Sequence, residues 1–124
     1  MKNGQHVLQL LPTLEQGGAE LYVQRLARKQ MLEPGRFAPV VCSFLRGGPV
    51  QDLLARDLIP MEVLELPRSS ISNPFRAARD LRLIFNAIVD VCRRHRIDLI
   101  QTHLSDSDWL GLLVGRKLGI PVVL

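Results

Sequence analysis

The sequence has few aromatic residues, only two cysteines and no long hydrophobic run. Aromatic residues make up 5% of the 124 positions and are not interleaved with basic residues, so nucleic-acid binding is not indicated. No apolar stretch approaches the roughly 20 residues that a membrane-spanning helix needs, and the N-terminus has no signal-peptide pattern. Cys42 and Cys92 lack the spacing of a metal or redox site, so we expect two buried free thiols in a cytoplasmic protein.

The sequence also lacks the motifs of several enzyme classes. It contains neither the G-x-G-x-x-G turn of dinucleotide-binding domains nor the lysine of a phosphate-binding loop. No serine or cysteine nucleophile pattern accompanies a histidine, so a hydrolytic triad is not supported. Asp106 and Asp108 have the positions of helix-capping residues and lack partner ligands for a metal. We therefore expect no cofactor, no metal site and no catalytic residue within this chain.

The composition is that of one globular domain spanning residues 1–124. Hydrophobic residues make up 47% of the chain and charged residues 23%, with a net charge of +4. Four basic positions, 93–96, close a predicted helix, where cations meet the negative end of the helix dipole. This cluster is either a solvated helix end or a site of attraction to an anionic membrane surface or a phosphorylated substrate.

Strand and helix patterns alternate along the whole chain. Strands are predicted at 6–11, 37–45, 61–66 and 97–102, and a fifth begins within 120–124. Helices are predicted at 18–31, 49–57 and 105–118, and Asn73 and Pro74 are expected to cap and open a long helix that the basic residues 93–96 close. This order predicts an α/β fold: a Rossmann-like three-layer α/β/α domain with a parallel sheet and helices on both faces.

Candidate site residues follow the predicted strands, at the sheet edge where ligands of such folds collect. The segments 13–18, 46–48 and 103–105 are expected to share that edge. Gly17 and Gly18 turn the chain into a helix whose first amides would suit a phosphate, a carboxylate or a sugar hydroxyl. The alternative for this pair is a turn that needs a positive φ, together with a helix start. His103 and Ser105 are also candidates, although His103 alternatively is a polar strand end without a function.

The final residues, 119–124, have the composition of a buried strand. A domain seldom stops inside an apolar strand, because that strand needs a neighbour and its far end must be solvated. We therefore expect the polypeptide to be the front part of a longer protein.

Three stretches of sequence resemble one enzyme family. They are VLQLLPTLEQGGAEL at 7–21, IDLIQTH at 97–103 and LLVGRKLGIPVV at 112–123. Their order and spacing resemble the N-terminal domain of GT-B-type retaining glycosyltransferases of the family 4-like group. The resemblance covers essentially the whole chain, and Gly-Gly-Ala-Glu after the first strand is its best motif.

The resemblance implies a two-domain enzyme that transfers a sugar from a nucleotide-sugar donor to an acceptor hydroxyl. The C-terminal domain, with its Glu-x7-Glu motif, would hold the donor, and that motif is not in this chain. This domain would form the acceptor side of the cleft and receive a glycan or a lipid-linked acceptor, with no transferase activity alone. Gly17, Gly18, His103 and Ser105 would face the cleft as substrate-binding residues. A cytoplasmic location is implied, with the inner face of the membrane as a possible place of peripheral contact.

Two other readings of the sequence remain open at this stage. The chain could be a stand-alone α/β binding or regulatory subunit that completes a partner's site. It could also be a nucleotide-dependent enzyme on a flavodoxin-like or Rossmann-like sheet, although the phosphate-binding motifs of such enzymes are lacking.

Overall fold

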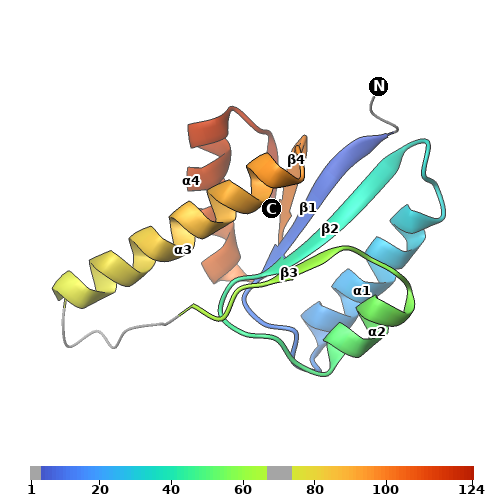
Figure 1. Ribbon diagram of the computed structural model, residues 1–124, viewed down its shortest axis with the longest axis horizontal. Helices are drawn as coiled ribbons and strands as arrows, with labels where there is room; N and C mark the ends of the chain where they lie inside the picture. The colour runs from blue at the N-terminus through green and yellow to red at the C-terminus, as the bar shows by residue number, and fades with distance from the viewer. Residues whose placement is uncertain (1–3, 67–73) are drawn as a thin grey trace.

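The sheet consists of five parallel strands in the order β3-β2-β1-β4-β5 in a computed structural model, which describes residues 4–66 and 74–124 (Figure 1). The strands are β1 (Gln5–Leu11), β2 (Phe37–Ser43), β3 (Met61–Val63), β4 (Leu99–Thr102) and β5 (Val122–Val123). The helices are α1 (Gly18–Met31), α2 (Val50–Arg56), α3 (Pro74–Arg94) and α4 (Ser105–Leu118). This architecture confirms the predicted parallel α/β domain.

The helices form two layers, one on each face of the sheet. Helices α1 and α2 lie on one side, and α3 and α4 lie on the other (Figure 1). Alternate residues of β1 point to opposite faces, as a pleated strand requires. Leu8 and Leu10 join the core under α3 and α4, whereas Leu11 joins the core under α1 and α2. The predicted three-layer arrangement is therefore confirmed.

The strand order places a reversal point in the centre of the sheet. From β1 the chain runs outward through β2 and β3, and it then returns to pair β4 with the other side of β1. Leu10 stands beside Thr102 in that pairing, so the two strands end next to each other. The reversal point of a doubly wound sheet is where ligands bind, at the carboxyl ends of the strands. Segments that follow β1 and β4 are consequently the place to look for a site.

Glycines let α4 approach the sheet closely. A Cβ atom added at Gly111 would collide with Cγ2 of Thr102, and one added at Gly115 would collide with Cγ2 of Val122. Gly119 ends the helix in the left-handed conformation, with φ 70°, that favours glycine. The predicted stop of this helix at Gly119 is confirmed.

Several predicted strands are longer than the observed ones. The second strand ends at Ser43 and not at Leu45, because the amide N–H groups of Leu45 and Arg46 donate to the carbonyl oxygen of Pro12 in the loop after β1. The third strand ends at Val63, the fourth begins at Leu99, and the fifth covers only Val122–Val123. The capping role predicted for Asn73 lies outside the described residues.

Both cysteines are buried and free, as predicted. They belong to the core on the α3 and α4 side of the sheet. Burial raises the pKa of the Cys42 thiol far above its ordinary value and raises that of Cys92 to about 12. These thiols are therefore structural groups and not nucleophiles. Within residues 4–66 and 74–124, no helix has the length and apolar character needed to cross a membrane.

Candidate functional site

The loops that follow β1 and β2 are held together at the carboxyl edge of the sheet. Leu45 N and Arg46 N lie 2.9 and 3.3 Å from Pro12 O. Val50 N, at the start of α2, lies 3.0 Å from Leu14 O. These backbone bonds fix the two loops side by side, as the sequence predicted for segments 13–18 and 46–48.

A hollow of about 360 Å³ opens between these loops and the segment after β4. Its walls are Pro12, Thr13, Leu45, Arg46, Leu66, Leu104 and Asp106. Arg46 Nε lies 2.7 Å from Glu15 Oε1, and this exposed ion pair lowers the pKa of the Glu15 carboxyl. Apolar side chains and charged side chains of both signs, Arg46 and Asp106, line the hollow. Sequence reasoning did not single out Arg46, although the Arg-Gly-Gly-Pro turn directly after a strand was a signal.

Gly17 and Gly18 form the corner between the β1 loop and α1. Gly17 is the N-cap residue and has extended backbone angles, φ −141° and ψ 175°. The reading of this pair as a turn with a positive φ is therefore wrong. A Cβ added at Gly18 would meet no atom within 4 Å, so the space beside the first turn of α1 is open. The Glu20 carboxylate occupies the space beside Gly17, because its Oε1 would lie 3.1 Å from a Cβ added there.

His103 directly follows β4 and is anchored through both its backbone and its ring. Its backbone N–H donates to Leu10 O over 3.0 Å, and its Nε2 lies 2.6 Å from Gln9 Oε1. The ring also meets the Tyr22 ring edge-on, with a centroid distance of 6.0 Å. Burial lowers the pKa of His103, and the negative charge of Asp108 offsets this only in part. Burial therefore favours the neutral imidazole.

A buried network of glutamines supports His103. Gln9 sits fully buried in the central strand, and its Nε2 lies 3.2 Å from Gln30 Oε1 and 2.9 Å from Gln101 Oε1. A buried amide is costly unless its donors and acceptor are paired, and these partners satisfy it. Sequence reasoning missed this network. The available signal was a polar residue in the middle of an otherwise apolar strand, at Gln9.

Ser105 is exposed and is the first residue of α4. The residue before it, Leu104, is the N-cap and holds unusual angles, φ 75° and ψ 153°, without a side-chain capping bond. The expectation that Asp108 caps the helix is wrong, because its Oδ1 instead accepts a 2.6 Å hydrogen bond from Thr102 Oγ1. The ring of His103 contacts Tyr22 of α1, one turn after Gly18. The described residues that line the hollow include none of the four predicted site residues, although Leu104 lies between His103 and Ser105.

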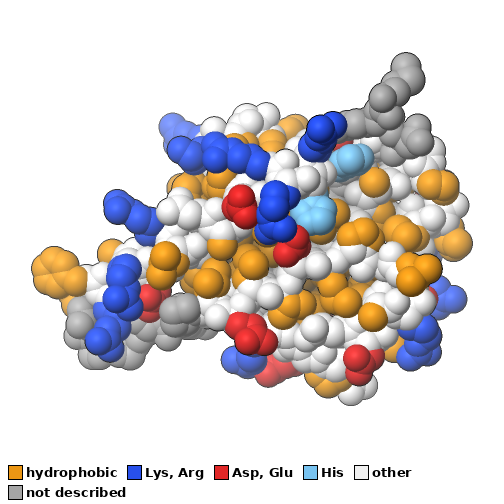
Figure 2. All heavy atoms as spheres, in the orientation of Figure 1, with side chains coloured by type: hydrophobic (Ala, Val, Ile, Leu, Met, Phe, Trp, Pro, Cys, Tyr) orange, Lys and Arg blue, Asp and Glu red, His pale blue; other side chains and the backbone are white. Residues whose placement is uncertain are grey.

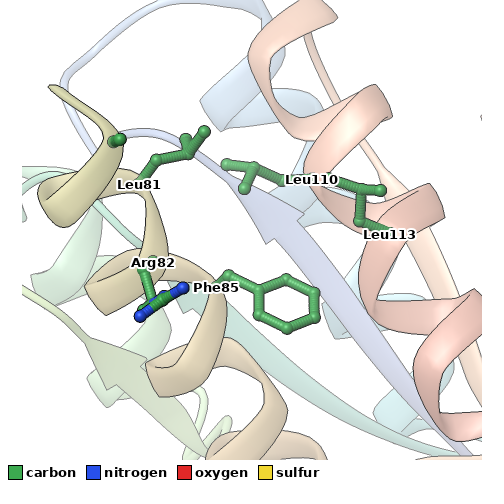
Figure 3. A pocket seen from close by; sticks show the side chains of 6 residues that line it. Leu81, Arg82, Phe85, Leu110 and Leu113 are labelled. Carbon is green, nitrogen blue, oxygen red and sulfur yellow. The ribbon is translucent and has the colours of Figure 1, made fainter. Parts of the chain in front are cut away.

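A second concave surface lies between α3 and α4. It is a groove of about 340 Å³ lined by Ala78, Leu81, Arg82, Phe85, Leu110 and Leu113. In Figure 3, Leu81 and Phe85 point from α3 toward Leu110 and Leu113 of α4. Leu81, at 38%, and Leu113, at 47%, keep enough exposure to make this an apolar surface open to solvent.

The basic end of α3 is largely engaged in local ion pairs. Charged side chains of both signs gather over this part of the molecule in Figure 2. Arg94 lies 2.7 Å from Glu62 and 2.9 Å from Asp90, and His95 Nε2 lies 2.9 Å from the same Glu62 oxygen. Burial would raise the pKa of Glu62, but the hydrogen bonds from His95 and Arg94 lower it on balance. Arg94 and His95 therefore tie α3 to β3.

Comparisons with known proteins agree on one fold. The family model described as glycosyl transferase 4-like domain matches residues 17–124. A glycosyltransferase from Rickettsia africae has 18% identity and a TM-score of 0.70, covering 97% of this chain and 29% of that one. Anabaena HepE in complex with UDP and glucose has 20% identity and a TM-score of 0.63, covering 94% and 28%.

One further match involves a protein of another kind. The C-terminal domain of a hydrogenase from Pyrococcus furiosus has 12% identity and a TM-score of 0.66, covering 99% of this chain and 92% of that domain. At these identities the structural likeness establishes the fold alone. No curated protein sequence gives a significant match.

Proposed function

The chain belongs to the glycosyl transferase 4-like domain family, and we propose that it forms the acceptor side of a glycosyltransferase's cleft. The enzyme would move a sugar from a nucleotide-sugar donor to an acceptor hydroxyl. The observation that carries this proposal is the carboxyl edge of the sheet, where the loops after β1, β2 and β4 surround an open hollow. An open α/β sheet binds its ligand at this edge, beside the reversal of strand order.

The first turn of α1 would serve the departing diphosphate. In glycosyl transfer, negative charge builds on the leaving group while the sugar gains oxocarbenium character. Free amides at a helix N-terminus stabilise such charge, and the open space at Gly18 would let a phosphate approach them. Gly17 adds no side chain at this corner, where a Cβ would approach the Glu20 carboxylate. No metal is required by this arrangement.

His103 and Ser105 would contact the acceptor. Burial favours the neutral form of His103, and its ring contacts Tyr22 of the helix that begins at Gly18. Ser105 supplies an exposed hydroxyl at the start of α4. A neutral imidazole and a hydroxyl are suited to hydrogen bonding with sugar hydroxyls, whereas a cationic imidazole would offer donors only.

The donor would be held by a second domain. The chain spans 29% of the length of the Rickettsia glycosyltransferase and 28% of HepE, so most of a matching enzyme lies beyond the matched part. HepE is described in complex with UDP and glucose, which supports a nucleotide-linked sugar as the donor of the proposed enzyme. Domain closure over both substrates would exclude water and limit hydrolysis of the donor.

A peripheral membrane contact through α3 fits a lipid-linked acceptor. The groove between α3 and α4 is apolar and carries Arg82 at its edge, and Phe75 near the start of α3 is 87% exposed. Apolar side chains beside cations match an anionic lipid surface. Vesicles of phosphatidylglycerol should bind the chain and vesicles of phosphatidylcholine should not. Arg82→Glu should weaken the binding, and equal binding to both vesicles would contradict it.

The stand-alone binding module remains the second candidate. It is favoured by the hydrogenase domain, which this chain covers over 92% of its length and which shows that the same fold occurs at this size. A binding titration tests the acceptor-side assignment. The chain alone is expected to bind UDP-glucose or GDP-mannose weakly or not at all in calorimetry, because the donor site belongs to the second domain. Tight binding of either nucleotide sugar would contradict the acceptor-side assignment.

A further inference from the structure

The hydrogen bonds of the glutamine network orient the side-chain amide of Gln9, and that orientation determines the tautomer of His103. The Nε2 group of Gln9 has two protons, and both have acceptors: Gln30 Oε1 at 3.2 Å and Gln101 Oε1 at 2.9 Å. Gln9 Oε1 is therefore the atom that faces His103 Nε2, at 2.6 Å. A carbonyl oxygen can only accept, so the imidazole nitrogen must donate.

A histidine that donates from Nε2 and is neutral carries no proton on Nδ1. Within residues 4–66 and 74–124, Nδ1 of His103 has no hydrogen-bond partner. The ring is half-buried beside Tyr22 and ends the strand next to the reversal point of the sheet. Nδ1 is consequently an unused acceptor at the edge where the substrate is proposed to bind.

We propose that Gln9 is a positioning residue, which holds His103 in the Nε2–H tautomer and leaves Nδ1 to accept a hydrogen bond from an acceptor-sugar hydroxyl. The second half of this inference rests on the proposed function, and the first half does not. This role explains why Gln9 is fully buried in the central strand. An aliphatic side chain there would need no hydrogen-bond partners, whereas a buried amide is costly unless it has them. Gln30 and Gln101 fix the orientation of the Gln9 amide, as a second layer of support.

The tautomer can be measured without any substrate. In the 15N-labelled chain, long-range 1H–15N correlation distinguishes protonated from unprotonated ring nitrogens, and a His103→Gln variant separates the signals of His103 from those of His6 and His95. The expected spectrum at pH 8 has a proton on Nε2 of His103 that exchanges slowly with solvent. A proton on Nδ1 would overturn the proposal, because the Gln9 amide would then have the opposite orientation.

The role of Gln9 is tested by its effect on the titration of His103. Gln9→Leu removes the acceptor, and the charged imidazole loses more from this than the neutral one, so the pKa of His103 should fall further. Asp108 and Tyr22, the groups that face His103 from the two adjoining helices, are unchanged in this variant. A rise in the pKa would mean that Gln9 had been donating, and it would overturn the proposal. Gln24→Leu is the matched control, since Gln24 pairs with Asp57 and should leave His103 unaffected.

A second measurement tests whether Nδ1 of His103 contacts a sugar hydroxyl, and its outcome is independent of the tautomer measurement. Methyl glucoside and methyl mannoside, added as probes, are expected to shift the Nδ1 resonance of His103 and not those of His6 or His95. Absence of any shift with the Nε2–H tautomer intact would overturn the contact between His103 and the acceptor while leaving the role of Gln9 standing. If Gln9→Leu does not fold, the spectrum of the unmodified chain alone still decides the tautomer.

Discussion

Thr102 Oγ1 donates a 2.6 Å hydrogen bond to Asp108 Oδ1, which joins the end of β4 to the first turn of α4. Thr102 is 5% exposed, so this bond is formed away from bulk water. It stands directly before His103 and spans the unusual backbone at Leu104. The bond therefore ties the first turn of α4, which carries Asp106 of the hollow, to the end of β4.

Removing this hydrogen bond should destabilise the protein. Thr102→Val deletes the hydroxyl and leaves the Asp108 carboxylate without that donor, so the free energy of unfolding should fall by about 1–2 kcal/mol. Chemical denaturation measures the change. Thr13→Val is the control, because the Thr13 hydroxyl makes only a 3.4 Å contact with Glu20. Equal stability of the two variants would contradict the structural role of the Thr102–Asp108 bond.

The close approach of α4 to the sheet makes Gly111 sensitive to substitution. Gly111→Ala places a methyl group against Cγ2 of Thr102 inside the core and should cost about 1–3 kcal/mol of unfolding free energy, despite the better helix propensity of alanine. Gly18→Ala is the matched helical control, since its new Cβ meets no atom within 4 Å. Thermal unfolding of both proteins checks the prediction, and a Gly111→Ala protein as stable as the parent would show that the helix is not in contact there.

Stability should depend on the titration of His103. Its folded-state pKa lies below the ordinary 6.5 because the ring is buried, so the unfolded chain binds the proton more readily. The contribution of the neutral ring to stability is complete above about pH 6.5 and is lost as the pH falls through the folded-state pKa. NMR titration of the ring measures this pKa. Asp108→Asn should lower it further, because the Asp108 charge raises it in the parent protein, and an upward shift would contradict this account.

The corner at Gly18 should matter for activity and not for folding. Gly18→Asp places a carboxylate in the open space beside the first turn of α1, where it would repel a diphosphate. In the enzyme that contains this domain, kcat/KM for the nucleotide sugar should fall by about tenfold or more, with unchanged stability. Gly35→Asp introduces the same charge in open space at a distant turn and should leave kcat/KM unaltered. Equal activities of the two variants would place the donor elsewhere.

The fold could be predicted because its signals are local. Alternating apolar strands and amphipathic helices fix the element order, and Gly119 marks a helix end that only a left-handed residue suits. The lengths of the strands were not predictable from those signals. Leu45 follows an apolar run typical of a strand, yet its amide N–H donates to the loop carbonyl of Pro12. That partner is set by the tertiary fold.

The candidate site was predictable only in part. Its location follows from the strand order, since segments after parallel strands meet at one edge. The partners of the His103 ring could not be found in this way, because Gln9 and Tyr22 are distant from it in sequence and are brought to it by the fold. The segment 46–48 was predicted to lie at this edge, but the place of the Arg46 side chain in the hollow depends on the bonds between two loops. Local patterns indicate which edge is used, and side-chain packing across the sheet decides which residues meet there.

The most direct test of the central claim is the sequence of the native reading frame after the codon for Leu124. The account predicts that translation continues through a second α/β domain of about 100–250 residues with a Glu-x7-Glu segment, which would hold the nucleotide sugar opposite the hollow at Arg46. A stop codon directly after Leu124 would contradict the account, because an acceptor-side domain without a donor domain cannot transfer a sugar.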